Sequence, residues 1–162
     1  MDLQPRIETL PQTRLVGKRT TMSFMANQTQ ALWQSFMPRL KEIKNSVGSE
    51  LYSVEVYPSP EFFRNFNPAG EFEKWAAVQV TNFDSVPAEM ETLVIPEGLY
   101  AVFTYKGKAS DGVSTYQYIY GTWIPDSAYN LDNRPHFALM GEKYRNEDPA
   151  SEEELWIPIT HK

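Results

Sequence analysis

The sequence predicts an α+β fold: a single domain over residues 1–162, in which two βαββ halves are related by a pseudo-two-fold axis. The first observation is an internal repeat, because PRIETLPQTRLVGKRT (5–20) resembles METLVIPEGLYAVFTYKG (90–107) in its Glu-Thr pair, its proline and its β-rich run. The second is that an amphipathic stretch and two β-type runs follow each copy. The halves cover about residues 5–82 and 90–162.

Residues 27–47 predict the first helix, because four apolar side chains recur there at the spacing that stacks them on one helical face. These side chains are Leu32, Phe36, Leu40 and Ile43. Asn27 is suited to cap the start and Gly48 the end. Pro38 lies inside the stretch, so we expect the helix to kink or split there.

Residues 110–123 predict the second helix by the same argument. The stripe consists of Val113, Tyr116, Ile119, Tyr120 and Trp123. Ser110 or Asp111 is suited to cap its start, and Pro125 should enforce its end. Core packing is the simplest role for the aromatic residues of this stripe, although Trp123, at the helix end, is also suited to form a pocket wall.

Four further runs are rich in β-branched and aromatic residues and predict strands that build antiparallel sheets around a central cleft. They are residues 51–57 and 75–81 in the first half, and 136–144 and 154–160 in the second. The segment 58–70 contains three prolines and three phenylalanines, Phe62, Phe63 and Phe66. It predicts an aromatic loop that either covers the core or folds over a ligand.

Composition excludes several functions. The chain has a net charge of −6 with scattered basic residues, so we expect no direct contact with nucleic acid. It has no cysteine and only His136 and His161, so we expect no metal and no cofactor. No run is apolar for the roughly 18 residues that a membrane span needs, and the N-terminus has no signal pattern. We therefore expect no membrane contact and a cytoplasmic location.

The run EEELWIPI (152–159) is the strongest candidate for a binding site. In a strand, Glu154 and Trp156 share one face and Leu155 and Ile157 the other. If Glu154 faces an aromatic cleft, its carboxylate attracts cations or acts as a general acid or base. The alternative is a solvated acidic turn, and the sequence leaves open which of residues 152–154 faces the cleft.

Five further residues are predicted to line the cleft. Trp75 follows Glu73 as Trp156 follows Glu154, so the two tryptophans should face each other across the axis. Tyr57 and Tyr144 end corresponding strands, Trp123 ends the second helix, and Phe63 lies in the aromatic loop. Burial in the core is the alternative for both strand tryptophans.

Four motifs in order resemble the GyrI-like, or AraC-type bacterial effector-binding, domain family. They are LWQSFMPRLKEIKN (32–45), IPEGLYAVFTYKG (95–107), YGTWIPDSAYNLDNRP (120–135) and EELWIPI (153–159). The resemblance implies a SOUL-like tandem βαββ fold with a cleft glutamate and aromatic residues that receive hydrophobic, often cationic, molecules. The matching positions are Glu154 and Trp156. In transcriptional members this domain follows a DNA-binding module, which the motifs here do not include.

Three functions are therefore compatible with the sequence. The first is a stand-alone small-molecule-binding protein for hydrophobic or cationic compounds, in transcriptional regulation or in toxin and drug tolerance. The second, which the resemblance suggests, is a hydrolase of reactive electrophiles with Glu154 as general base. The third is a protein-interaction role such as gyrase inhibition, which would need a protein partner.

Overall fold

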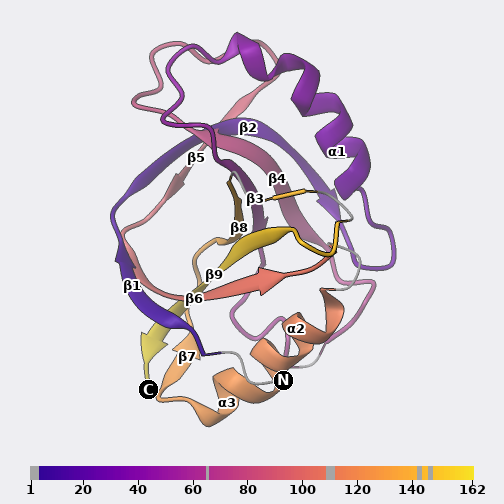
Figure 1. The fold of residues 1–162 in the computed structure, drawn as a ribbon, viewed down its shortest axis with the longest axis vertical. Coiled ribbons are helices and arrows are strands. Elements are labelled where there is room, and N and C mark those ends of the chain that lie inside the picture. Colours follow the sequence, from indigo (N-terminus) through magenta and orange to yellow (C-terminus); the bar gives the residue numbers. More distant parts are fainter. Residues whose placement is uncertain (1–3, 65, 109–111, 142–143, 146–147) are drawn as a thin grey trace.

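The computed structural model describes residues 4–64, 66–108, 112–141, 144–145 and 148–162. It has the predicted α+β architecture, with one large antiparallel sheet and two main helical segments (Figure 1). The strands are β1 (Arg6–Leu10), β2 (Thr13–Met22), β3 (Leu51–Val56), β4 (Phe72–Gln79), β5 (Glu91–Ile95), β6 (Gly98–Lys106), β7 (Tyr129–Leu131), β8 (His136–Met140) and β9 (Glu152–His161). The α-helices are α1 (Thr29–Phe36), α2 (Val113–Tyr118) and α3 (Ile124–Asp126).

The strand order displays the pseudo-two-fold symmetry. The sheet runs β1-β6-β9-β8-β3-β4-β2-β5, with β7 added beside β9, so equivalent strands lie at equal distances from the β8–β3 junction. Each repeated run is two strands rather than one, because Pro11 and Pro96 lie in the turns that divide them. The first strand of each half pairs with the other half: β1 with β6, and β5 with β2.

Pro38 divides the first helical segment, as predicted. The α-helix ends at Phe36 and a 3₁₀ segment continues over Met37–Glu42. The Asn27 carboxamide accepts a hydrogen bond from the backbone N–H of Thr29 at 2.9 Å. Gly48 has a left-handed φ of 69°, but the helical turns already end at Glu42, so its expected role as the helix cap is wrong.

The second helical segment ends three residues later than predicted. A π-helical stretch over Ile119–Trp123 joins α2 to α3, and helical structure ends at Asp126. Pro125 lies in the first turn of α3, where a missing N–H is tolerated, and does not stop the chain at Trp123. The expected caps Ser110 and Asp111 lie outside the described residues.

The curved sheet is covered on both faces. Its inner face forms a core that contains no helical residue and includes Trp75, Tyr100, Phe137 and Trp156. On the outer face, α1 packs over one half of the sheet and α2 over the other (Figure 1). Every central strand is therefore packed on both of its faces. Apolar side chains alone do not show which face carries a binding site.

Candidate functional site

A row of polar side chains crosses the outer face of the sheet beside α2. Strand register places Glu55 of β3 opposite Lys74 of β4 on one side and opposite His136 of β8 on the other. The Lys74 ammonium donates a hydrogen bond to Glu55 Oε1 at 2.8 Å, and the two side chains are only 8% and 17% exposed. Because burying a charge is costly unless it is paired, loss of either partner would leave an unfavourable unpaired charge at this point.

His136 completes the row as a neutral side chain. It is buried, and its Nδ1 lies 2.8 Å from the Tyr120 hydroxyl of the second helical segment. Burial, with a smaller contribution from Arg134, lowers the pKa of His136 to about 3. The imidazole therefore carries no charge at neutral pH and links the sheet to the helix above it.

Aromatic rings cover this row. Phe63 stacks on Tyr120 with 3.9 Å between ring centroids and 6° between planes, and Tyr57 meets His136 edge-on at 4.8 Å. Tyr116 lies parallel to Tyr120, one helical turn away. Burial raises the pKa of Tyr57, Tyr116 and Tyr120 well above 10, so all three hydroxyls stay protonated.

A small cavity lies between these rings and the sheet. It is lined by Glu55, Tyr57, Tyr116, Tyr120, His136, Phe137, Leu155 and Ile157. Its volume is about 10 Å³, which is about enough for one water molecule. Ligand pockets are typically about 300–1,000 Å³, so a drug-sized molecule could enter only if the aromatic cover moved.

A second carboxylate lies beyond the cavity on the same outer face. Glu153 of β9 pairs with Tyr105 of β6 and shares its face with Leu155 and Ile157. Burial, reinforced by the negative charge of Glu55 and opposed by Lys74, raises the pKa of Glu153 to about 7. At neutral pH this group is poised to take up or lose a proton.

The structure places Glu154 on the opposite face, so the expectation that Glu154 faces the cavity is corrected. It pairs with Thr104 in the ladder and lies beside Trp156, whose Nε1 donates to Glu154 Oε1 at 3.2 Å. Arg6 Nη2 donates to the other carboxylate oxygen at 2.8 Å. Trp156 itself is buried in the inner core, stacked on Phe137.

The first half contains the same arrangement. Trp75 Nε1 donates to Glu73 Oε1 at 2.6 Å, and Arg19 forms an ion pair with Glu73 at 3.2 Å. Trp75 is likewise part of the inner core, away from the cavity. The repeated Glu-x-Trp pattern therefore marks a symmetric pair of Arg–Glu–Trp contacts that anchor the inner core.

Two of the predicted site residues lie at the cavity: Tyr57 lines it and Phe63 covers it. Trp123 packs on Phe103 and Tyr129, and Tyr144 lies in the turn after β8; neither is among the lining residues. The lining residues that sequence analysis did not select are Glu55, Tyr116, Tyr120, His136, Phe137, Leu155 and Ile157. Two signals pointed to some of them: a lone glutamate inside the apolar run LYSVEVY, and tyrosines four residues apart on a helix.

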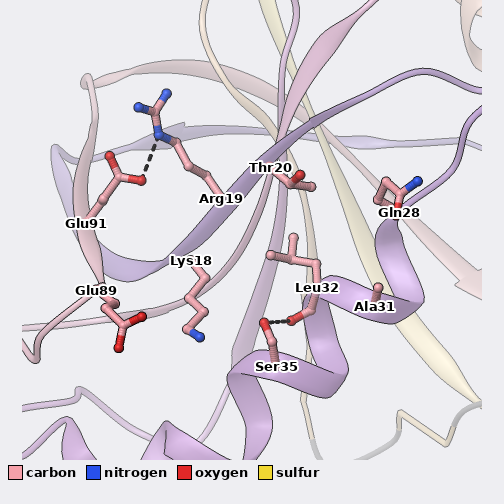
Figure 2. Close-up of a pocket in the computed structure, with 9 residues that line it drawn as sticks. All are labelled: Lys18, Arg19, Thr20, Gln28, Ala31, Leu32, Ser35, Glu89 and Glu91. Carbon is pink, nitrogen blue, oxygen red and sulfur yellow. Dashed lines mark hydrogen bonds and ion pairs between the residues drawn. The ribbon is translucent and has the colours of Figure 1, made fainter.

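A wider groove lies between β2 and α1 (Figure 2). It shares no lining residue with the aromatic-covered cavity. Its volume is about 330 Å³ and its walls are mainly polar, with Lys18 and Glu89 at one end. Arg19 on its rim is already bonded to Glu91 at 2.8 Å. None of its lining residues is aromatic, so it lacks the flat apolar walls that hold hydrophobic ligands.

Within the described ranges, no group of His, Asp and Glu side chains is arranged to hold a metal ion. In the same part of the chain, no helix has the length and apolar character needed to cross a membrane.

The structure is a domain of two pseudo-symmetric βαββ halves with an aromatic-covered carboxylate cluster on the outer face of its sheet. The chain belongs to the GyrI-like family: the family model, described as a GyrI-like small molecule binding domain, matches residues 3–160. The family that its motifs resemble is therefore confirmed.

One relative is similar in sequence, and two solved structures are similar in fold. The chain is 28% identical over 160 residues to the transcriptional regulator BrlR of Pseudomonas aeruginosa, covering 98% of the chain but only 56% of that regulator. The structure of SAV2435 bound to tetraphenylphosphonium has a TM-score of 0.72 and 16% identity, covering 99% of this chain and 94% of that one. The EcmrR C-terminal domain has a TM-score of 0.72 and 15% identity, with 100% of both chains covered.

Proposed function

We propose that this domain binds hydrophobic organic cations beneath the second helical segment, at the aromatic-covered carboxylate site. Glu55 and Glu153 would supply negative charge, and Tyr57, Phe63 and Tyr120 would supply flat apolar walls. The observation that carries the proposal is the partial burial of two carboxylates with one buried ammonium group beside a layer of aromatic rings.

The chemistry of the site favours a cation over other ligands. Aromatic faces and carboxylates both attract positive charge, and both act more strongly where water is excluded. A neutral apolar ligand would leave the charge of Glu153 uncompensated, since Lys74 pairs with Glu55, and an anion would be repelled by Glu153. A hydrophobic cation can contact the aromatic walls and also compensate the negative charge.

Two relatives support this assignment. SAV2435, a structure of similar fold, is bound to tetraphenylphosphonium, a hydrophobic cation. BrlR is a transcriptional regulator, and the chain spans about half its length. We infer that ligand binding here reports the presence of such compounds to a regulatory system or sequesters them.

Calorimetry with two probes of matched shape tests the proposal. Tetraphenylphosphonium should bind the wild type, whereas tetraphenylborate, which has a similar shape and the opposite charge, should not. Glu153→Gln should weaken phosphonium binding by roughly tenfold, since it removes a buried charge from the site. Glu154→Gln changes the neighbouring carboxylate on the opposite face and should leave binding unchanged. Equal binding of the two probes, or loss of binding in Glu154→Gln alone, would contradict the proposal.

The hydrolase alternative also has an observation in its favour. Glu55 borders a cavity of about one water molecule, and the pKa of Glu153 is about 7, which suits a general base at neutral pH. Incubation with epoxides and mass analysis separate the two functions. If the domain only binds, the epoxide is recovered unchanged. A hydrolysed product that the wild type forms and Glu153→Gln does not form would make the domain an enzyme.

A further inference from the structure

Lys74 is a buried cation inside the proposed cation site. It lies on β4, next to Glu55 in the ladder, and its ammonium forms the 2.8 Å contact with Glu55. Positive charge at this point is unexpected where a cationic ligand is to bind, because like charges repel. The role of Lys74 must therefore be understood from the total charge of the site.

The charged groups around the site can be counted. The outer face of the sheet carries four ionisable side chains, one from each of four strands: Lys74 (β4), Glu55 (β3), His136 (β8) and Glu153 (β9). Four tyrosines lie around them: Tyr57, Tyr105, Tyr116 and Tyr120. The histidine and the tyrosines at the cavity are neutral at pH 7. Arg134, which acts on His136, is paired with Asp132 at 2.6 Å.

Among the described residues, two carboxylates and one ammonium therefore determine the charge. Lys74 compensates Glu55 directly, and Glu153 is left as the carboxylate without a direct ion pair. With Glu153 ionised, the site has a net charge of −1. Binding one further positive charge makes it neutral, whereas a doubly charged ligand leaves an uncompensated positive charge in the interior, which is strongly unfavourable.

We propose, on the basis of the function proposed above, that Lys74 determines the charge class of the ligand, so that the site accepts monocations and rejects dications. Lys74 is then a specificity-determining residue that acts through its pairing with Glu55. Without it, both carboxylates would be uncompensated, and the site would accommodate two positive charges.

Two flat probes of similar size test this rule. N-methyl-phenylpyridinium carries one positive charge, and methyl viologen, a bipyridinium, carries two. Their affinities are measured by calorimetry for the wild type and for Lys74→Met, Lys74→Arg and the double variant Glu55→Gln/Lys74→Met. The wild type and Lys74→Arg should prefer the monocation. In Lys74→Met the ratio of affinities should move by about tenfold or more toward the dication.

The double variant is the matched control, because it removes the ion pair but restores the net charge of −1. Its preference should return to the monocation, which separates the effect of charge from the effect of losing the lysine side chain. If Lys74→Met does not fold, as judged by its thermal midpoint, Glu55→Gln alone tests the rule by removing a negative charge instead of a positive one. It makes the site neutral and should weaken monocation binding by about tenfold.

The outcomes are distinguishable from those for the proposed function. Monocation binding with the same affinity ratio in wild type and Lys74→Met overturns the charge rule and leaves cation binding intact. A double variant that still prefers the dication also overturns it. Absence of binding to every one of these proteins overturns the proposed function and the charge rule together.

Discussion

Glu153 is the single residue whose surroundings should dominate the pH dependence of stability near neutrality. Its pKa is about 7 in the folded chain and near the ordinary value of 4.5 when unfolded. Between these values the folded state binds more protons, so the free energy of unfolding falls as the pH rises. His136 acts in the opposite direction: its folded pKa of about 3 makes the folded state lose stability as the pH falls below about 6.5.

Glu153→Gln separates these effects, because glutamine does not titrate. At pH 4 the variant and the wild type should have similar free energies of unfolding. At pH 8 the variant should be more stable by about 2 kcal/mol, since the wild type must bury an ionised carboxylate. Urea unfolding across this pH range measures the difference, with Glu154→Gln as control. A difference independent of pH would contradict the assigned burial of Glu153.

Two glycines, Gly17 and Gly121, should differ in how much stability the protein loses when each is replaced by alanine. A Cβ on Gly17 of β2 would lie 2.6 Å from the Cα of Ala77 and collide with the backbone of β4. A Cβ on Gly121 would meet no heavy atom within 4 Å. We expect Gly17→Ala to lower the free energy of unfolding by about 2 kcal/mol or more, because β2 must move away from β4. Gly121→Ala should be neutral or slightly stabilising, since it lies in a helical segment.

We expect the aromatic loop between β3 and β4 to control access to the proposed site. Phe63 stacks on Tyr120 and thereby closes the site, while Phe66 is more exposed and packs beside it. Phe63→Ala should increase the association rate of a hydrophobic cation, because the stacking no longer has to break. It should also weaken the affinity, because one apolar wall is lost.

Stopped-flow fluorescence with the aromatic probes measures both quantities. Phe66→Ala is the matched control and should change neither by more than about twofold, since Phe66 does not touch Tyr120 in the ring contacts of the described residues. An association rate that Phe63→Ala leaves unchanged would show that ligands enter by another route.

Many of the helices and strands could be predicted from the sequence, because apolar periodicity and proline act on the local backbone. The apolar stripe of the first helix and the break at Pro38 were both predicted. The alternation along β9 was also correct. The Leu155 face is packed in a core, but the face that carries Glu154 and Trp156 is packed in a core as well, so the error was to assign the Glu154 face to a cleft. In a sheet buried on both faces, hydrophobicity does not distinguish the two.

The cavity residues were harder to predict because they come from elements far apart in the chain. Glu55 and Lys74 become partners only through the register of β3 on β4, and Tyr120 meets His136 only through packing of the second helical segment on the sheet. Tyr57 and Phe63 could be selected because the neighbouring sequence places Tyr57 at the end of a strand and Phe63 in an aromatic loop. Long-range pairing has no comparable signal in one sequence.

At the scale of the whole molecule, the exchange of first strands should make the two halves interdependent. Strands β1 and β5 each complete the sheet of the opposite half. A chain cut between residues 82 and 90 should therefore give two fragments that fold together and co-purify as a one-to-one complex, whereas each alone remains largely unfolded. Circular dichroism and size-exclusion chromatography of separate and mixed fragments measure this. Independent folding of either fragment would contradict the interdependence.

The strand exchange also bears on the origin of the domain. Two separate copies of one half, associated about a two-fold axis, would give the palindromic order of the eight main strands if each contributed its first strand to the other. Joining the two copies by a short connection such as residues 82–90 would turn that dimer into this chain. Duplication and fusion would then free the two halves to diverge, so that the charges of Glu55, Lys74 and Glu153 could gather beside one helix alone.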